Sequence, residues 1–138
     1  MRQIYETAAD LKNEREVAEM LTHAWCADLK KTPPKYPYDY IAIDGTEVVA
    51  FIEIKNRNNA ADKYETYMIS LDKIVQCQTA SVISGVGFYL VVRFTDKVMF
   101  WSFSENQFHV ESGGRFDRGD KQDVEPVVHI PMIYFKEV

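Results

Sequence analysis

A predicted helix between two strongly β-prone runs constrains the fold of this chain more than any other feature. The runs are residues 47–55 and 87–94, both rich in Ile, Val, Tyr and Phe. Ser70 is a suitable N-cap for a helix over residues 71–84, and Gly85 is suited to end it. A connection of this length can cross over a sheet, so we expect the two runs to be parallel neighbours in one sheet.

The other predicted elements complete a mixed α/β order. Apolar side chains recur at helical spacing near the N-terminus until Pro33 and Pro34 stop that helix. Asp44 and Gly45 form a strong hairpin signal between the first two strands. We therefore expect a central mixed sheet of four to five strands, flanked by helices. The predicted elements are a helix over residues 5–29, strands over 38–43 and 47–55, a helix over 71–84, and strands over 87–94 and 98–103.

Length and composition indicate one globular domain over residues 1–138. Of the 138 residues, 46% are hydrophobic and 27% are charged, which excludes a disordered chain. Typical domains have about 100–150 residues. Within the domain we expect a core over residues 5–103, a polar loop excursion over 104–125, and a C-terminal strand or tail over 126–138 that is broken at Pro131.

Several classes of protein are disfavoured. No apolar run approaches the ~18 residues of a membrane span, and the N-terminus lacks the apolar region of a signal peptide. Cys26 and Cys77 stand in no metal or disulfide spacing, so we expect reduced, buried thiols in a cytoplasmic protein. The net charge of −5 argues mildly against binding nucleic acid by electrostatics alone. It does not exclude a nucleic-acid enzyme whose site contains divalent cations.

The run at residues 47–55 ends with charged side chains on an otherwise apolar strand. Strand periodicity places Phe51, Glu53 and Lys55 on one face. A buried carboxylate and a buried ammonium are costly unless they bind each other or a ligand. The simpler alternative is an ion pair that emerges into solvent at the strand end.

Asp39 is a second carboxylate among apolar residues, at the start of the preceding strand. A three-residue hairpin loop would place it opposite Phe51 or Val49, on the face that carries Glu53. A two-residue loop would place it opposite Ala50, on the other face. A site that includes Asp39 therefore requires an odd-numbered loop or a bulge.

Glu14 is a third candidate carboxylate. It lies in the middle of the apolar stripe of the first helix, whereas Glu16 and Glu19 point away from that stripe. An acidic residue on a core-facing stripe usually has a partner. Alternatively, Glu14 lies in the exposed first turns of the helix or caps neighbouring backbone.

Three carboxylates and a lysine that converge at the end of a sheet suit a hard divalent cation such as Mg²⁺ or Mn²⁺, which takes oxygen ligands. Such a metal lowers the pKa of bound water and neutralises charge on a scissile phosphate. A lysine next to a ligand can orient the attacking water or stabilise the developing charge.

These residues and their surroundings resemble the PD-(D/E)xK nuclease superfamily, in particular Holliday-junction-resolvase-like and small phage-encoded nucleases. The segments that carry the resemblance are NEREVAEML, YDYIAIDG, VVAFIEIKNR and GVGFYLVVRF. The resemblance implies a restriction-endonuclease-like αβββαβ core. Tyr38, where the motif has proline, is a departure. The site residues that it implies are Asp39 and Glu53 as metal ligands, the Ile54 backbone carbonyl as a further ligand, Lys55 as the catalytic lysine, and Glu14 as a helix-borne catalytic carboxylate and ligand.

The helix over residues 71–84 is the second place where substrate could bind. In the resembled superfamily this helix often carries a Lys or Gln that faces the site, and Lys73 and Gln76 share one face here. The helix N-terminus at Ser70 would favour a phosphate, and Arg57 could join a basic rim around it. The alternative for Lys73 is an ordinary solvated lysine.

His23, His109 and His129 are scattered along the chain in no metal-ligand spacing. We expect a structural role for His23, which has no acidic neighbour at helical spacing except Glu19.

The sequence thus predicts a Mg²⁺- or Mn²⁺-dependent deoxyribonuclease in the cytoplasm of a bacterial or phage-infected cell. Its expected partners are DNA, and a second copy of the chain or a larger complex, but no membrane. The alternative is a catalytically silent module of the same fold that acts in protein or DNA binding within a larger assembly. The net charge of −5 and the lack of a basic tail suit that alternative.

Overall fold

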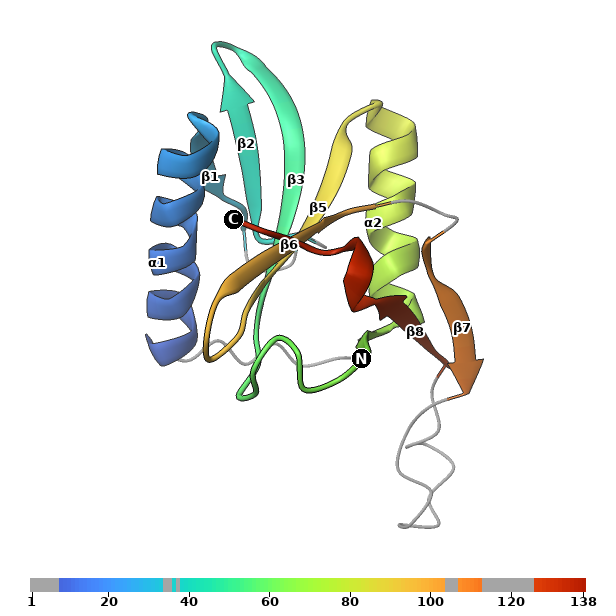
Figure 1. Ribbon diagram of the computed structural model, residues 1–138. Coiled ribbons are helices and arrows are strands. Elements are labelled where there is room, and N and C mark those ends of the chain that lie inside the picture. Colours follow the sequence, from blue (N-terminus) through green and yellow to red (C-terminus); the bar gives the residue numbers. More distant parts are fainter. Residues whose placement is uncertain (1–7, 34–35, 37, 104–106, 113–125) are drawn as a thin grey trace.

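The protein places a mixed β-sheet between two helices, with a smaller sheet beside the second helix (Figure 1). The computed structural model describes residues 8–33, 36, 38–103, 107–112 and 126–138. Its elements are α1 (Ala8–Trp25), β1 (Asp28–Lys31), β2 (Tyr40–Asp44), β3 (Glu47–Asn56), β4 (Thr66–Ser70), α2 (Leu71–Ser84), β5 (Gly87–Arg93), β6 (Val98–Ser102), β7 (His109–Ser112), β8 (Pro126–Pro131), a 3₁₀ turn η4 (Met132–Tyr134) and β9 (Lys136–Glu137).

The main sheet has the strand order β1-β2-β3-β5-β6-β9. β3 and β5 run parallel, from Ala50 opposite Gly87 to Asn56 opposite Arg93. The other neighbouring strands of this sheet are antiparallel. The predicted mixed α/β fold, its two hairpins and the parallel pair joined through α2 are therefore confirmed.

Both ends of α2 lie where the sequence predicts them. The Ser70 hydroxyl oxygen accepts a hydrogen bond from the Lys73 backbone N–H at 3.3 Å. At the other end Gly85 adopts a left-handed conformation with φ of 72°, and its N–H donates to the Ser81 carbonyl at 2.8 Å. These caps satisfy backbone groups that a helix otherwise leaves without partners.

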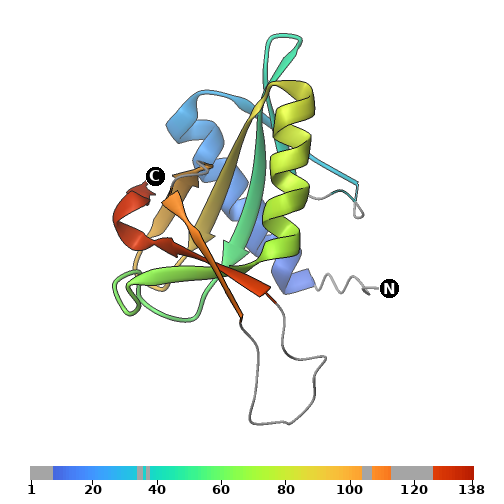
Figure 2. The ribbon, with the colours of Figure 1, turned by 90° about the vertical axis from the view of Figure 1, so that its right-hand side faces the viewer.

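The smaller sheet has the antiparallel order β4-β8-β7. It packs against the same face of the main sheet as α2, and β4 leads directly into α2 (Figure 2). Alternate side chains of β4 and β8 are buried in the core: Tyr67, Ile69, Val128 and Ile130.

Two hydrophobic cores lie on opposite faces of the main sheet, because its central strands bury side chains on both sides. α1 covers one core through Val17, Ala18 and Leu21. α2 and the smaller sheet cover the other, which contains the fully buried Trp101.

The first helix is shorter than predicted. It ends at Trp25 instead of residue 29, because Cys26 has a positive φ of 52° and Asp28–Lys31 pairs with β2. Backbone pairing with a neighbouring strand here outweighs the local helical pattern. Residues 5–7 of the predicted helix lie outside the described residues.

The sequence also missed several short strands. β4 precedes α2 where no strand was expected, β7 lies within the predicted loop excursion, and β9 adds an edge to the main sheet. Each is too short for a clear alternation of side chains and forms through pairing with distant partners. Residues 104–106 and 113–125 of the excursion lie outside the described part of the chain. The break in the last predicted strand is confirmed at Pro131, where β8 ends and η4 follows.

The prediction of two buried thiols is half right. Cys77 is fully buried on α2, whereas Cys26 is exposed at the end of α1.

Candidate active site

A bulge in the β2–β3 hairpin brings Asp39 to Glu53. The turn is tight, with Asp44 opposite Glu47, but the register shifts next to Ala42. Beyond the shift Tyr40 lies opposite Ile52, and the Asp39 N–H donates to the Ile52 carbonyl at 2.9 Å. The predicted need for an irregular hairpin is thus confirmed. The predicted position of Asp39, opposite Phe51 or Val49, is wrong, because a bulge and not a three-residue loop shifts the register.

The Asp39 carboxylate is held against β3. Its Oδ2 atom accepts a hydrogen bond from the Ile54 backbone N–H at 2.7 Å. Burial raises the pKa of Asp39, although this hydrogen bond and the positive charges of Lys31, Lys55 and Lys73 lower it. Asp39 is therefore a fixed, partly desolvated carboxylate beside the end of the strand.

Glu53 is the most buried charged residue described, with 3% of its surface exposed. Its Oε1 atom lies 3.3 Å from Lys55 Nζ and 3.4 Å from Lys73 Nζ. Burial, followed by the charge of Asp39, raises the pKa of Glu53 to about 7 against the opposing effect of the two lysines. The sequence-based alternative of an ion pair emerging into solvent does not apply, because the carboxylate is enclosed.

One oxygen of this cluster has no protein partner. Glu53 Oε2 is buried and accepts no hydrogen bond from the described residues. A buried carboxylate oxygen in this position is costly unless a ligand satisfies it. The hard oxygen atoms of Asp39 and Glu53 therefore fit a divalent cation such as Mg²⁺.

Lys73 belongs to this cluster and is not an ordinary solvated lysine. The cap at Ser70 sets the first turn of α2 beside the end of β3, and the Lys73 side chain is 17% exposed. Gln76, on the same helix, is exposed, and no described contact joins it to Glu53. Ser70 is in use as the N-cap.

The described contacts of the Arg57 side chain are with β4 and with the neighbouring Asn56 carbonyl. Its guanidinium lies 4.7 Å from the centroid of the Tyr67 ring and donates to the Met68 carbonyl at 3.3 Å. The Arg57 side chain therefore links the end of β3 to β4.

Glu14 lies beside the cluster, on α1. Its Oε2 atom is 2.8 Å from Lys31 Nζ, and Lys31 Nζ is 4.0 Å from Asp39 Oδ1. The predicted partner of Glu14 thus exists, and it is a lysine on β1 that links the two carboxylates. The sequence did not single out Lys31 for this role, because β1 was assigned to a helix and a connector.

Tyr67 and Cys77 are buried side chains next to Glu53. Burial raises the pKa of both groups, to about 12 for Cys77, and the charge of Glu53 raises each further. The Tyr67 hydroxyl is buried and has no hydrogen-bond partner among the described residues. The strand β4, which turns Tyr67 inward, was not predicted from the sequence.

The mixed sheet, the crossover helix and the cluster of Asp39, Glu53 and Lys55 are the arrangement expected for a protein of the PD-(D/E)xK nuclease type. The family model described as "Phage putative PDDEXK endonuclease" matches residues 1–138, and the chain belongs to this family.

A solved structure supports the fold. Hjc, a Holliday junction resolvase from Archaeoglobus fulgidus, is 17% identical over 84% of this chain and 88% of its own, with a TM-score of 0.53. No curated protein matches the chain in sequence. Within the described residues, no helix is both long and apolar enough to cross a membrane.

Proposed function

We propose that the protein is a Mg²⁺- or Mn²⁺-dependent endonuclease that hydrolyses phosphodiester bonds in DNA. The observation that carries the proposal is the convergence of Asp39, Glu53 and Lys55 at the end of β3, where Glu53 Oε2 is buried and has no hydrogen-bond partner among the described residues. Membership of a family described as endonucleases supports this chemistry.

Asp39 and Glu53 would hold the metal. The Ile54 backbone carbonyl is proposed as a further ligand, and Glu14 as a ligand or as an acidic group that acts through Lys31. When bound, the metal would supply a water of lowered pKa and positive charge at the scissile phosphate.

The lysines act on the water and on the substrate. Lys55, 3.3 Å from Glu53, is placed to orient the attacking water and to stabilise charge that develops on the phosphate. Lys73 stands at the first turn of α2, where its ammonium and the helix N-terminus both favour a phosphate group. Ser70 positions that turn, and Gln76 and Arg57 remain candidate outer contacts to DNA.

The name of Hjc supports branched DNA as the first substrate to test. Since a chain of 138 residues offers little surface for such a substrate, we propose that it works as a homodimer or within a larger complex.

The test combines calorimetric titration with Mg²⁺ and Mn²⁺ and cleavage of plasmid and branched DNA. Wild type, Asp39→Ala and Glu53→Ala are compared with Glu47→Ala, which removes an exposed carboxylate from the same strand. We expect Mg²⁺ binding and cleavage in the wild type and the Glu47 control, and the loss of both in the other two variants.

Mg²⁺ binding that survives in both Asp39→Ala and Glu53→Ala would overturn the site. Metal binding in the wild type without cleavage of any substrate, alone or with cell extract, would favour the alternative of a silent binding module.

A further inference from the structure

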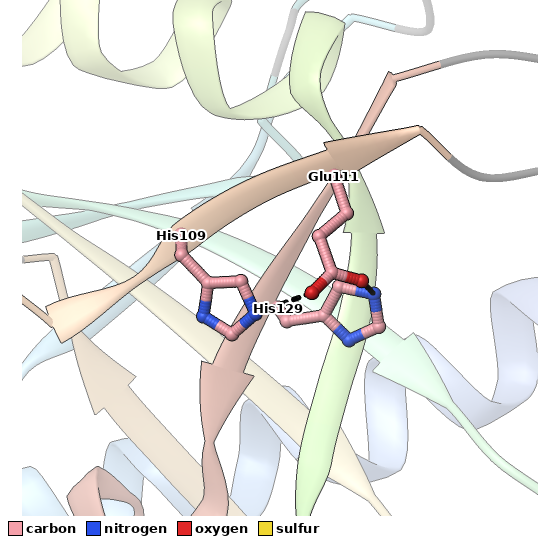
Figure 3. A group of neighbouring side chains, drawn as sticks. All are labelled: His109, Glu111 and His129. Atoms are coloured by element: carbon pink, nitrogen blue, oxygen red, sulfur yellow. Dashed lines mark hydrogen bonds and ion pairs between the residues drawn. The ribbon is translucent and has the colours of Figure 1, made fainter.

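A second cluster of ligand-type side chains lies on the smaller sheet. His109 and Glu111 are on β7, and His129 lies directly opposite His109 on β8. His109 Nε2 is 3.1 Å from Glu111 Oε1, and His129 Nε2 is 3.4 Å from Glu111 Oε2. Figure 3 shows the two imidazoles side by side, with the carboxylate reaching both. One ligand atom from each residue lies within 4.8 Å of the others.

The spacing of the histidines along the chain does not predict this cluster, although the structure brings two of the three together. His109 and His129 stand far apart along the chain. They meet because β7, which was not predicted, pairs with β8 in a register that aligns them.

A neighbouring hydroxyl orients one of the rings. Thr66 Oγ1, on β4, lies 2.9 Å from His129 Nδ1. If Nδ1 donates its proton to this oxygen, Nε2 keeps its lone pair and points toward Glu111. Histidines that bind metals are commonly held in this way by a hydrogen bond to their other nitrogen.

The cluster is separate from the candidate active site. Val128 and Ile130, which flank His129 along β8, are fully buried in the core that also contains Cys77. Since side chains alternate along a strand, His129 and its partners lie on the opposite, outer face of the smaller sheet. His109 and Glu111 are exposed, and His129 is partly exposed.

We propose that His109, Glu111 and His129 form a second metal site, which binds Zn²⁺ or a similar divalent transition metal. Imidazole nitrogens and a carboxylate suit such an ion, whereas Mg²⁺ prefers oxygen ligands. In a tetrahedral zinc site neighbouring ligand atoms lie about 3.4 Å apart. Here the two histidines approach different oxygens of Glu111, and one ligand atom from each of the three residues lies within 4.8 Å of the others. Water fills the remaining position, and the bound ion joins β7 to β8.

The competing explanation is that Glu111 only forms ion pairs with protonated histidines. Such ion pairs need no metal, so this explanation predicts that the protein does not bind zinc at these residues. A zinc site binds more tightly at higher pH, because the metal requires neutral imidazoles.

The experiment is calorimetric titration of the full-length protein with ZnCl₂ at two pH values, together with Co²⁺ absorption spectra. Variants are His109→Ala, His129→Ala and, as a matched control, His23→Ala, which removes an exposed histidine from α1. Asp39→Ala with Glu53→Ala removes the candidate magnesium ligands. Circular dichroism checks that each variant folds.

We expect one zinc ion per chain, with tighter binding at the higher pH. Removal of a residue that only hydrogen-bonds a metal ligand typically weakens metal binding by about 10- to 100-fold. Loss of either cluster histidine should weaken zinc binding by more than this. His23→Ala and the Asp39/Glu53 double variant should keep the site. Absence of zinc binding, or zinc binding that survives in both His109→Ala and His129→Ala, would overturn the proposal. Loss of zinc binding in the Asp39/Glu53 double variant would also overturn the proposal.

Discussion

The two clusters of ionisable side chains in this protein contrast in burial and in the atoms that they offer. Around Glu53 the candidate ligand atoms are buried carboxylate oxygens. Glu53 Oε1 lies 3.3 Å from Lys55 Nζ and 3.4 Å from Lys73 Nζ. Around Glu111 they are imidazole nitrogens and one carboxylate on an open sheet face. Desolvation dominates the first cluster and raises the pKa of Glu53 to about 7.

The two clusters therefore differ in their effect on the stability of the folded protein. A buried carboxylate destabilises the folded protein unless a cation is close. Binding of a cation at the first cluster would therefore stabilise the folded protein. An exposed cluster costs little while empty, since water solvates its members. The first is therefore suited to metal and phosphate chemistry, and the second to a metal that adds stability.

The largest effect is expected from the lysines of the buried cluster. Lys55→Met should lower kcat for DNA cleavage by about 100- to 1000-fold, because charge that develops on the phosphate is no longer stabilised. Lys73→Met should mainly raise KM, because this lysine stands at the helix end where a phosphate would bind. Steady-state kinetics on a branched substrate separates the two effects.

Lys12→Met is the control for both, because that lysine is 70% exposed on α1. Equal losses of kcat in the Lys55 and Lys73 variants would contradict the division of roles.

A smaller effect should appear in metal-free stability. The pKa of Glu53 in the folded protein is about 7, above its ordinary value of 4.5. The folded state therefore disfavours the ionised form, and the free energy of unfolding should fall as the pH rises from about 4.5 to about 7. Glu53→Gln should remove this fall and be more stable than wild type at pH 8.

The gain in the free energy of unfolding of Glu53→Gln at pH 8 is at most about 3 kcal/mol, because the variant also loses the ion pairs with Lys55 and Lys73. Urea unfolding in EDTA over this pH range measures it, with Glu47→Gln as the exposed control. Parallel pH profiles for wild type and Glu53→Gln would show that Glu53 titrates normally. In the wild type, Mg²⁺ should bind more tightly as the pH rises through about 7, because the ionised carboxylate is the ligand.

The smallest effect should come from Thr66, whose hydroxyl oxygen lies 2.9 Å from His129 Nδ1 of the exposed cluster. Thr66→Val should weaken zinc binding by about 10-fold, because His129 loses the hydrogen bond that orients its ring. Magnesium binding and DNA cleavage should not change. Equal losses at both metal sites would show that the two clusters are coupled through β4, which carries Thr66 outward and Tyr67 inward.

Local patterns in the sequence were sufficient for the crossover and for part of the candidate site. The caps at Ser70 and Gly85 act within one turn of α2, so the helix boundaries could be predicted without knowledge of any distant residue. The alternation along β3 likewise placed Glu53 and Lys55 on one face. Asp39 was identified as a candidate, but its position depended on the hairpin register.

The partners of these residues could not be predicted in the same way. Lys31 reaches Glu14 and Asp39 because β1 pairs with β2, whereas local patterns assigned this segment to the end of a helix and a connector. Lys73 reaches Glu53 only because α2 packs beside the end of β3.

The sequence by itself determined the α/β order, the capped crossover helix and the candidate set of Asp39, Glu53 and Lys55, because these follow from interactions between near neighbours in the chain. Only the tertiary structure decided the bulge that sets Asp39 beside Glu53 and the strand pairing that brings His109 to His129. Strand register depends on side-chain packing summed over many distant contacts, and a shift of one residue turns every side chain to the opposite face.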